Sequence, residues 1–466
     1  MSESGFVLTA AEMAEAFGGT LAAGVAATAL PDVSIDTRTL QPGALYVALV
    51  GPTFDGHAFV ADAVARGAAG VVVSDLRATE GLPPAVPIIH VADTLQGMQQ
   101  AAHVVRRRSG TRVVAITGSA GKTTTKEIAA ALLSTHVTTF RTHGNLNNHI
   151  GLPLSLFHLH TCPAMAVVEL GMSGPGEIRR LVEIAEPDVR VWLNVGSAHL
   201  GHFASIEGIA DAKAEILEGA GRDDLLVANA GDPLVMARVQ HFAGQTLTFG
   251  VDVAADVAVR DVEALGPAGM RATLVARGHS ATFSTPLLGE GNLANIAAAA
   301  AVALDAGVPF DAVVRTVPTI GPAPHRGQVV QAPGGWTVID DAYNSSPEAL
   351  QRVLAALEAV RGRRVVLLGE MLELGEASVA LHAEAGRAVA ALAPDVLAVV
   401  GGAAAEALVR AAVDAGLDPA RASHESDSAT LAARVRSLVR PGDVVLVKGS
   451  RGIAMDRVVA ALVEEA

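Results

Sequence analysis

A glycine-rich turn that ends in Lys122 and Thr123 has the residue types that bind phosphate. The apolar run 113–116 leads into Thr-Gly-Ser-Ala-Gly-Lys-Thr-Thr at 117–124, and the following segment, Lys126 to Leu133, is typical of a helix. In such a loop, backbone N–H groups and a helix N-terminus converge on one anion. The Lys122 ammonium then reaches the β- and γ-phosphates of a nucleotide, and the Thr123 hydroxyl holds magnesium. The alternative is a strand-to-helix turn that binds nothing.

The loop departs from the commonest nucleotide-binding pattern at one position. That pattern has a glycine two residues before Gly118, where this chain has Ile116. The shorter form, Thr-Gly-x-x-Gly-Lys-Thr, resembles the loop of the Mur ligases and of the related folate polyglutamylating enzymes, and does not choose among them. The resemblance implies an ATP site made of Gly118, Ser119, Gly121, Lys122, Thr123 and Thr124.

An asparagine-rich segment, residues 142–153, follows the predicted phosphate loop. Three asparagines and two histidines fall within residues 143–149. These side chains are costly to bury without partners, so the segment is either solvated or binds something polar, and we favour binding. It resembles the Mur ligase motif Thr-x-Gly-Asn-x-Asn-Asn-x-Ile-Gly-x-Pro, which lines the sugar-peptide substrate beside ATP. The substrate-binding residues implied are Asn145, Asn147 and Asn148.

Three further residues are candidate metal ligands. Glu169 lies near the end of a predicted buried strand, where open α/β sheets bind ligands, and we favour a magnesium ligand over a paired structural acid. His199 and Lys213 show no such signal by themselves, since a histidine after a strand is usually structural and a lysine on an amphipathic helix is usually exposed. The resemblance implies that His199 ligates a second magnesium, together with a carbamate that Lys213 forms with carbon dioxide.

Two asparagines begin an alanine-rich helix further along the chain. Asn292 and Asn295 lie three residues apart, on one face of its first turn. Asparagine at a helix start is often a cap, and the pattern does not separate a cap from a ligand contact. The resemblance implies that both asparagines contact ATP. The family commonly has histidine where this chain has Gly291.

A second polar cluster follows the predicted strand 337–340, in the string Asp340-Asp341-Ala342-Tyr343-Asn344. A helix cap explains Ser345 and Pro347 but not two adjacent acids. The string, together with residues 369–375, resembles the Mur ligase that adds D-alanyl-D-alanine. The member that adds the third amino acid carries an Asp-Tyr-Ala-His-Thr-Pro type of string instead, which this chain lacks.

The resemblance also implies roles for the residues of this cluster. Arg326 and Asp340 complete the ATP site, and Asp341, Tyr343 and Asn344 bind substrate. The usual form has Ala-Asn where this chain has Ser345-Ser346, which leaves open whether these two positions touch substrate.

The first hundred residues carry a separate pattern. The string Asp-Thr-Arg that ends at Arg38 precedes the strand-like run 45–49 and Asp-Gly-His-Ala-Phe at 55–59. By residue type alone, Thr37 and Arg38 belong either to a small-ligand rim or to an exposed polar turn, and we favour the turn. The run resembles the first domain of Mur ligases, which holds the uridine nucleotide of the substrate, and this implies that Thr37 and Arg38 lie near its diphosphate.

The elements that position these residues predict an α/β protein of three domains. A chain of 466 residues is long for one domain, and its strand and helix patterns alternate. We expect a small N-terminal α/β domain over 1–100 and a central P-loop NTPase-like parallel-sheet domain over 101–320. A proline- and glycine-marked linker near 317–324 leads to a Rossmann-like C-terminal domain over 321–466.

Composition limits the class of partner and the compartment. The formal charge of -14, without basic clusters, argues against a nucleic-acid partner. A single cysteine, Cys162, forms no internal disulfide and fits a reducing compartment. Arg38 is the first basic residue, and no apolar run is long enough to span a bilayer. We therefore expect a soluble cytoplasmic protein without an integral membrane segment, and a monomer.

Taken together, the motifs predict an ATP-dependent amide ligase that uses Mg²⁺. The resemblance implies transfer of the γ-phosphoryl of ATP to the carboxylate of UDP-N-acetylmuramoyl-tripeptide, followed by attack of D-alanyl-D-alanine, a step of peptidoglycan precursor synthesis. Two alternatives remain open. Another ligase of the same fold, such as the third-residue-adding Mur ligase or folylpolyglutamate synthase, differs only in its acceptor and amine pockets. A phosphate-loop switch protein hydrolyses ATP without any amine.

Overall fold

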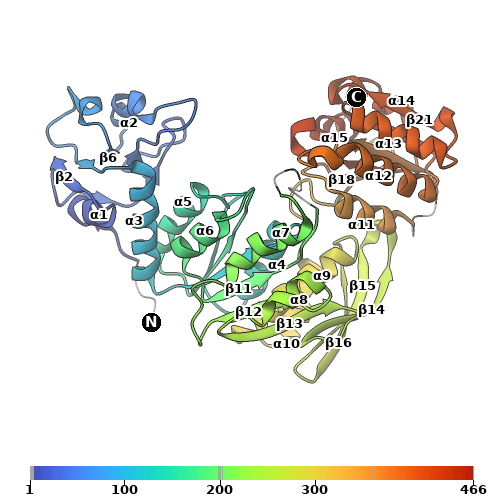
Figure 1. Ribbon diagram of the computed structural model, residues 1–466, viewed down its shortest axis with the longest axis horizontal. Coiled ribbons are helices and arrows are strands. Elements are labelled where there is room, and N and C mark those ends of the chain that lie inside the picture. Colours follow the sequence, from blue (N-terminus) through green and yellow to red (C-terminus); the bar gives the residue numbers. More distant parts are fainter. Residues whose placement is uncertain (1–4, 198–200, 202, 359, 361, 465–466) are drawn as a thin grey trace.

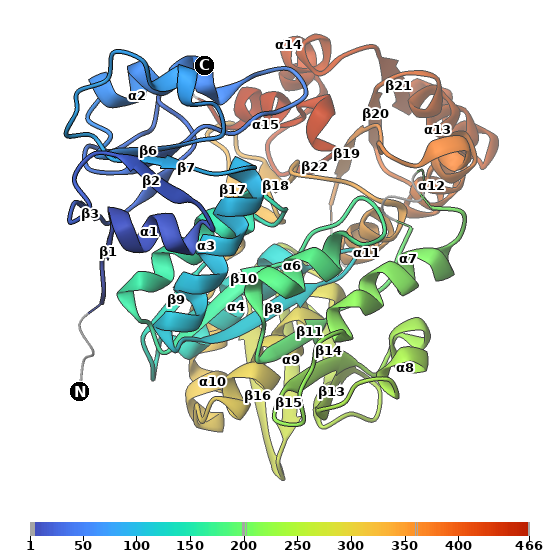
Figure 2. The same cartoon turned by 60° about the vertical axis from the view of Figure 1, so that its left-hand side comes forward.

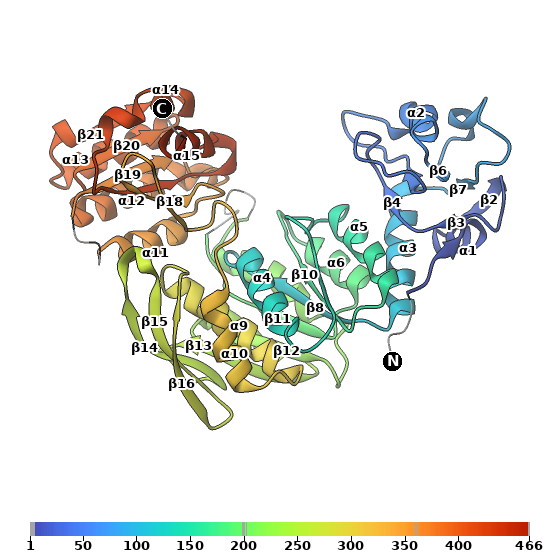
Figure 3. The same cartoon turned by 180° about the vertical axis from the view of Figure 1, so that it is seen from behind.

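The computed structural model describes residues 5–197, 201, 203–358, 360 and 362–464. Three α/β units follow one another along the molecule, with the first (blue) and the third (red) at opposite ends of the central one (Figure 1). The view from behind shows the same order (Figure 3). The helix α3 (Thr94–Ser109) runs from the first unit onto the central one (Figure 2). The expected class, α/β with three domains, is confirmed.

The first unit is built on a five-stranded sheet. Its elements are β1 (Leu8–Thr9), α1 (Ala10–Ala16), β2 (Thr20–Ala23), β3 (Ala29–Leu30), β4 (Val33–Ser34), β5 (Leu45–Val47), α2 (Val60–Ala65), β6 (Gly70–Val73) and β7 (Ile88–His90). The strand order is β2-β7-β6-β5-β4, with β2 antiparallel to β7 and the other pairs parallel. The inner strands β5 and β6 are buried along their length, which is why they consist almost entirely of apolar residues.

The central unit is built on a nine-stranded sheet of order β16-β15-β14-β13-β12-β11-β8-β10-β9. Its strands are β8 (Arg112–Thr117), β9 (Thr139–Arg141), β10 (Met165–Glu169), β11 (Val189–Trp192), β12 (Leu225–Asn229), β13 (Gln245–Val251), β14 (Val257–Ala264), β15 (Met270–Ala276) and β16 (His279–Thr285). Pairing is parallel from β9 to β14 and antiparallel among β14, β15 and β16. The strands β14 to β16 therefore extend the same sheet at its antiparallel end.

Helices cover both faces of this central sheet. They are α4 (Lys122–Leu133), α5 (Gly151–Phe157), α6 (Glu177–Ala185), α7 (Ile206–Ala214), α8 (Pro233–Val239), α9 (Glu290–Asp305) and α10 (Phe310–Thr316). Successive residues of β8 alternate between two apolar clusters: Val113 and Ala115 pack with α3, α5 and α6, whereas Val114 and Ile116 pack with α4 and α9. This alternation follows from the pleat of the strand, and it buries β8 on both faces.

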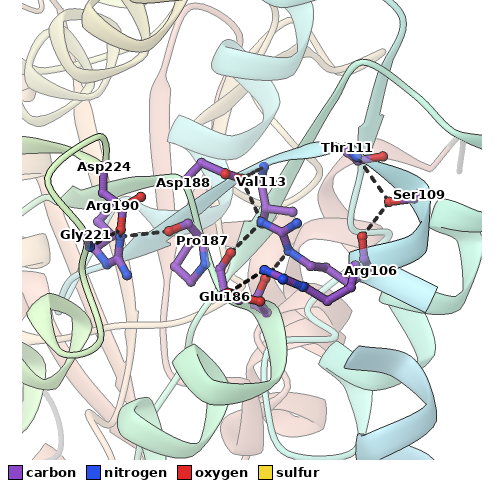
Figure 4. A network of polar contacts seen from close by, with 12 residues as sticks. Arg106, Ser109, Thr111, Val113, Glu186, Pro187, Asp188, Arg190, Gly221 and Asp224 are labelled. Atoms are coloured by element: carbon purple, nitrogen blue, oxygen red, sulfur yellow. Dashed lines mark hydrogen bonds and ion pairs between the residues drawn. The ribbon is translucent and has the colours of Figure 1, made fainter. Parts of the chain in front are cut away.

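A polar network fixes the amino-terminal edge of the sheet (Figure 4). The guanidinium of Arg106, at the end of α3, donates to the Asp188 carboxylate at 2.7 Å, which also accepts from the Val113 N–H at 2.7 Å. Arg190 on β11 donates to Asp224 at 2.7 Å. These ion pairs hold α3, β8 and β11 together at the edge opposite the phosphate loop, so the loop begins from a fixed base.

The third unit is a six-stranded sheet of order β17-β18-β22-β19-β20-β21. Its elements are β17 (Gln328–Gln331), β18 (Thr337–Asp341), α11 (Pro347–Glu358), β19 (Arg364–Gly369), α12 (Ser378–Leu392), β20 (Val396–Val400), α13 (Ala403–Asp414), β21 (Ala422–Glu425), α14 (Ser428–Leu438), β22 (Val444–Lys448) and α15 (Asp456–Val463). Pairing is parallel except between β17 and β18. One face packs on α11 to α13 and the other on α14 and α15.

The predicted start of the helix after the phosphate loop was wrong. The helix after the phosphate loop begins at Lys122 rather than Lys126, because the Thr125 N–H already donates to the Gly121 carbonyl at 2.8 Å. The strand β11 ends at Trp192, where the chain turns toward the phosphate loop. None of the described helices combines the length and apolar character needed to cross a membrane.

Candidate active site

The phosphate loop joins the end of β8 to the start of α4. Gly121 has a φ of +92°, and a Cβ there would lie 2.3 Å from Oδ1 of Asn295, so only glycine fits. Asn194, which follows β11, braces the loop from the other side: its side chain accepts from the Ala120 N–H at 2.9 Å and donates to the Ala120 carbonyl at 3.0 Å. The loop is therefore held open as a rigid backbone cradle.

Lys122 lies at the centre of this cradle. Its ammonium donates to the Gly118 carbonyl at 2.6 Å. Burial lowers the pKa of Lys122 to about 8; the carboxylate of Glu169 opposes this shift and the charge of Arg326 adds to it. These charges come from three separate segments, so the fold brings the predicted lysine, metal ligand and third-domain arginine to one place.

We expect an alkaline limb near pH 8 in the pH profile of kcat/KM for ATP. As pH rises through the Lys122 pKa of about 8, the free enzyme loses the ammonium that would hold the phosphates. The decline should approach about tenfold per pH unit. Bound phosphate favours the charged form, so kcat should fall at higher pH than kcat/KM. Lys122→Arg does not titrate in this range and its residual activity should lack the limb. The same limb in both proteins would assign it to another group.

The predicted magnesium ligands Thr123 and Glu169 lie side by side. The Thr123 hydroxyl is 3.3 Å from Oε2 of Glu169, and the Asn147 amide nitrogen is 3.5 Å from the same oxygen. Glu169 is 1% exposed, and its Oε1, which accepts no hydrogen bond among the described residues, lies 3.2 Å from the Lys126 ammonium. A hydroxyl and a carboxylate are ligands that Mg²⁺ takes, together with phosphate oxygens, and the pair fits a magnesium ion.

The other two predicted metal ligands are His199 and Lys213. Within the described ranges, no group of three or more His, Cys, Asp or Glu side chains is arranged to hold a metal. His199 lies outside the described residues. Lys213, near the end of α7, is 1% exposed, so the default expectation of a surface lysine was wrong. Burial, and then the charge of Lys122, lower the pKa of Lys213 well below its usual value.

The asparagine-rich loop places its three asparagines differently. Asn147 packs over Gly171, where a Cβ would lie 2.9 Å from the amide carbon, and its side chain is the one directed at Glu169. Asn148 fixes the turn that leads into α5, since its Oδ1 accepts from the N–H groups of residues 150 and 151 at 3.1 and 2.8 Å. Asn145 is exposed. Substrate binding by these residues stays a prediction.

Asn292 and Asn295 connect the start of α9 to the phosphate loop. Asn292 donates to the Leu288 carbonyl at 2.9 Å and accepts from the Asn295 amide at 3.0 Å. Asn295 in turn packs on Gly121. The pair therefore supports the cradle from the side of α9, and its contact with ATP stays a prediction.

A third-domain arginine packs against Gly291. A Cβ at 291 would lie 2.9 Å from Cδ and 3.0 Å from Nε of Arg352, a residue of α11. Burial lowers the pKa of Arg352, and the charges of Glu348 and Asp341 oppose this. The missing side chain at 291 thus leaves the space that a cation from the third domain enters.

We expect Gly291→Ala to lower kcat/KM for ATP about fivefold, which corresponds to about 1 kcal/mol of coupling. The added methyl displaces Arg352 and weakens the packing of α11 on α9. In an Arg352→Ala background the same substitution should change little, because the side chain it displaces is gone. Steady-state kinetics of the four proteins gives the coupling. Equal losses in both backgrounds would count against this contact.

The third-domain cluster is held together by paired charges. His325 Nδ1 lies 2.7 Å from Oδ2 of Asp340, and burial raises the pKa of Asp340 despite hydrogen bonds from Ala342 and His325. The Lys448 ammonium donates to Asp341 at 2.6 Å and to the Asn344 carbonyl at 2.9 Å. Both acids therefore have side-chain partners within one cluster, which the role of a helix cap alone would not explain.

Tyr343 lies between two arginines of this cluster. The Arg326 guanidinium lies 4.0 Å from the centre of its ring and the Arg451 guanidinium 5.3 Å, with Arg451 Nη1 3.3 Å from the Tyr343 hydroxyl. Two cations over one aromatic ring make this part of the cluster strongly positive. Ser346, one of the two departures from the usual string, accepts from the Ala349 N–H at 3.3 Å and so caps α11.

The third unit touches the central one beside the phosphate loop. Glu348 on α11 accepts from the Ser197 N–H at 2.7 Å. The neighbouring residue, Gly196, exchanges hydrogen bonds with the hydroxyl of Ser119 at 2.8 and 3.2 Å. A movement of the third unit is thereby linked to the phosphate loop through two residues.

Thr37 and Arg38 lie in the first unit, away from the residues above. Thr37 is largely buried, and Arg38 is exposed and pairs with Asp36 of its own loop at 2.6 Å. The first unit stands at the far end of the central one from the third (Figure 1). The structure therefore brings Lys122, Glu169 and Arg326 together and leaves Thr37 and Arg38 in the first unit.

Sequence reasoning missed several residues of the site. One of them, Lys448, has a signal in the sequence, because it ends a strand as Asp341 does. The two residues are paired neighbours on β22 and β18. The others, which lie in helices or after strands without any motif of their own, are Lys126, Asn194, Glu348 and Arg352.

Comparisons with known proteins cover the whole chain. Models described as Mur ligase family, catalytic domain, Mur ligase middle domain, and Mur ligase, glutamate ligase domain match residues 32–106, 116–303 and 325–451. The UDP-N-acetylmuramoyl-tripeptide--D-alanyl-D-alanine ligase of Bacillus subtilis is 34% identical over 465 residues, 98% of each chain.

Solved structures give the same result. MurF from Acinetobacter baumannii superposes with a TM-score of 0.88 at 30% identity, covering 99% of this chain and 100% of that one. The MurF ligase from Thermotoga maritima in complex with ADP gives 0.81 at 30% identity, covering 92% and 96%. The chain therefore belongs to the Mur ligase family.

Proposed function

We propose that this protein is the ATP-dependent, ADP-forming ligase that joins D-alanyl-D-alanine to UDP-N-acetylmuramoyl-tripeptide, in peptidoglycan precursor synthesis. One observation carries the assignment: the ligase of that name from Bacillus subtilis matches 98% of both chains at 34% identity. The match includes the third unit, whose motif separates the dipeptide-adding ligase from the third-residue-adding ligase and from folylpolyglutamate synthase. A cytoplasmic location belongs to the same proposal, since the reaction consumes ATP.

Each unit has its own part in the proposal. Residues 1–100 hold the uridine nucleotide, with Thr37 and Arg38 near its diphosphate. Residues 101–320 bind ATP and the peptide end of that substrate, and residues 321–466 supply the amine side. The ATP contacts are Gly118, Ser119, Gly121, Lys122, Thr123, Thr124, Asn292, Asn295, Arg326 and Asp340, and the substrate contacts are Asn145, Asn147, Asn148, Asp341, Tyr343 and Asn344.

The reaction proceeds through an acyl phosphate. The γ-phosphoryl of ATP passes to the terminal carboxylate of the tripeptide, and ADP leaves. This replaces a carboxylate oxygen, a poor leaving group, with phosphate, a good one. The amine of the dipeptide then attacks the acyl carbon and releases inorganic phosphate. Each step moves negative charge toward the phosphoryl oxygens, so positioned cations are what the enzyme must provide.

The chain provides these cations and holds the phosphates. Lys122 and the N–H groups at the start of α4 face the β- and γ-phosphates, and Arg326 adds a third-domain charge close to Lys122. Thr123 and Glu169 would hold one Mg²⁺, and His199 and carbamylated Lys213 a second. Bound magnesium would supply Lewis-acid stabilisation of the same charge. Because the site uses residues of two units, closure of the third unit must precede transfer.

Phosphate release with UDP-N-acetylmuramoyl-tripeptide, measured with and without D-alanyl-D-alanine, tests the assignment. We expect release to require both substrates and Mg²⁺. Single amino acids, and glutamate with a folate, should not replace the dipeptide and the nucleotide substrate. Release that needs glutamate and a folate, or that proceeds without any amine, would instead support one of the two alternative functions.

A further inference from the structure

Lys126 is a buried lysine that no motif assigns. It lies one turn beyond Lys122 on α4, and its side chain is 0% exposed. Its ammonium donates to the carbonyls of Thr142 and Gly144 at 2.7 and 3.0 Å. It also lies 3.2 Å from Oε1 of Glu169. A lysine side chain has three donors and no acceptor, and this one is surrounded by oxygens.

These contacts join two separate parts of the site. Thr142 and Gly144 begin the asparagine-rich loop, whereas Glu169 ends β10. Holding Oε1 of Glu169 leaves its Oε2 facing the Thr123 hydroxyl and the Asn147 amide, at 3.3 and 3.5 Å. One ammonium therefore sets both the entrance of the loop and the orientation of the carboxylate.

The network also extends outward from Lys126. Oε1 of Glu127 lies 3.2 Å from the ammonium, and Oε2 of Glu127 accepts from Arg141 at 2.7 Å. Glu127 is about 29% exposed, and the Arg141 partner about 50%. An exposed pair of this kind contributes little, so the inner contacts of Lys126 are the ones that matter.

We infer that Lys126 is a positioning residue for the acyl acceptor, a nucleotide-linked sugar peptide. It fixes the start of the loop that receives this substrate and turns one carboxylate oxygen of Glu169 toward Thr123. This inference rests on the proposed function. Lys126 acts through Thr142, Gly144 and Glu169, whose oxygens surround its ammonium.

Lys126→Met tests this role, because methionine keeps the length of the chain and removes the charge and the donors. Calorimetry without ATP or metal should show that UDP-N-acetylmuramoyl-tripeptide binds at least tenfold more weakly. Binding of ADP without metal should change less than twofold, since the phosphate loop keeps its own supports. Mn²⁺ should bind a few fold more tightly, because Glu169 loses its neighbouring cation.

Glu127→Gln is the matched control, and it should leave all three affinities within twofold. If Lys126→Met does not fold, Lys126→Arg serves instead. It keeps the charge, but a planar guanidinium does not reproduce the three contacts, so the nucleotide substrate should bind several fold more weakly with ADP binding unchanged.

Equal weakening of ADP and the nucleotide substrate would reduce Lys126 to a general structural role and overturn the inference, as would unchanged substrate affinity. The proposed function fails in a different way. Wild-type protein would then not bind UDP-N-acetylmuramoyl-tripeptide at all, and the inference that Lys126 positions this substrate would fall with it. The wild-type titration therefore separates the two failures.

Discussion

Glu169→Gln is expected to lower kcat about a thousandfold, which corresponds to about 4 kcal/mol of transition-state stabilisation. The carboxylate is 1% exposed and lies 3.3 Å from the Thr123 hydroxyl, at the end of the buried strand β10. Glutamine keeps the shape and the contact with Asn147 but has no charge to offer a divalent cation. It also leaves the Lys126 ammonium without its buried counter-charge.

The measurement is phosphate release at saturating substrates over a range of Mg²⁺ concentrations. ADP binding in the absence of metal shows whether the phosphate loop is still intact. The loss should be only partly recovered at high Mg²⁺, while metal-free ADP binding changes little. Glu177→Gln is the matched control, since this glutamate lies further on, at the start of α6, and within the described part of the chain accepts a hydrogen bond only from the Ser173 N–H. A Glu169→Gln enzyme that retains a tenth of wild-type kcat would exclude Glu169 as a metal ligand.

The sequence predicted the parts of the site that lie where strands end. The glycine-rich loop follows β8, Glu169 ends β10, and Asp340 and Asp341 end β18. In parallel sheets, carboxyl ends of neighbouring strands meet at one edge, so polar residues at such positions converge without any knowledge of the tertiary fold. The same principle explains why Lys448, at the end of β22, pairs with Asp341.

Residues that act through tertiary packing were not predictable in this way. Lys213 and Lys126 both lie on helices where lysine is ordinarily exposed, and only the fold shows that each is buried. Arg352 and Gly291 lie in different units, and nothing in either local sequence links them. Asn148 shows the opposite difficulty, because a residue inside a motif typical of binding holds the turn before a helix.

The contacts between the central and third units give these residues a common function. Glu348 receives the Ser197 N–H beside the phosphate loop, and Arg352 occupies the space above Gly291. Both come from the first two turns of α11, whose start follows the Asp-Asp-x-Tyr-Asn string. One helix therefore starts beside the third-domain cluster and contacts the segment next to the phosphate loop, so a movement at one place is passed to the other.

Lys213→Ala is expected to lower kcat at least a hundredfold, and short carboxylates should restore part of the loss. The side chain is 1% exposed, and burial together with the charge of Lys122 lowers its pKa well below the usual value. The neutral amine is the form that attacks carbon dioxide. Carbamate formation would replace this neutral amine with an anion, which the nearby Lys122 ammonium attracts.

The charge of the small molecule that restores activity tests whether Lys213 acts as an anion or as a cation. Acetate or formate, added to the Lys213→Ala enzyme, offers carboxylate oxygens in the space the lysine leaves, whereas ammonium or methylamine restores only a cation. If Lys213 acts as a carbamate, carboxylates should raise kcat of the variant at least tenfold and amines should not, and wild-type kcat should fall when carbon dioxide is removed from the buffer. Restoration by amines, with no dependence on carbon dioxide, would show that Lys213 acts as an ammonium. Its lowered pKa argues against that outcome, since a buried cation next to Lys122 is the state that the fold disfavours.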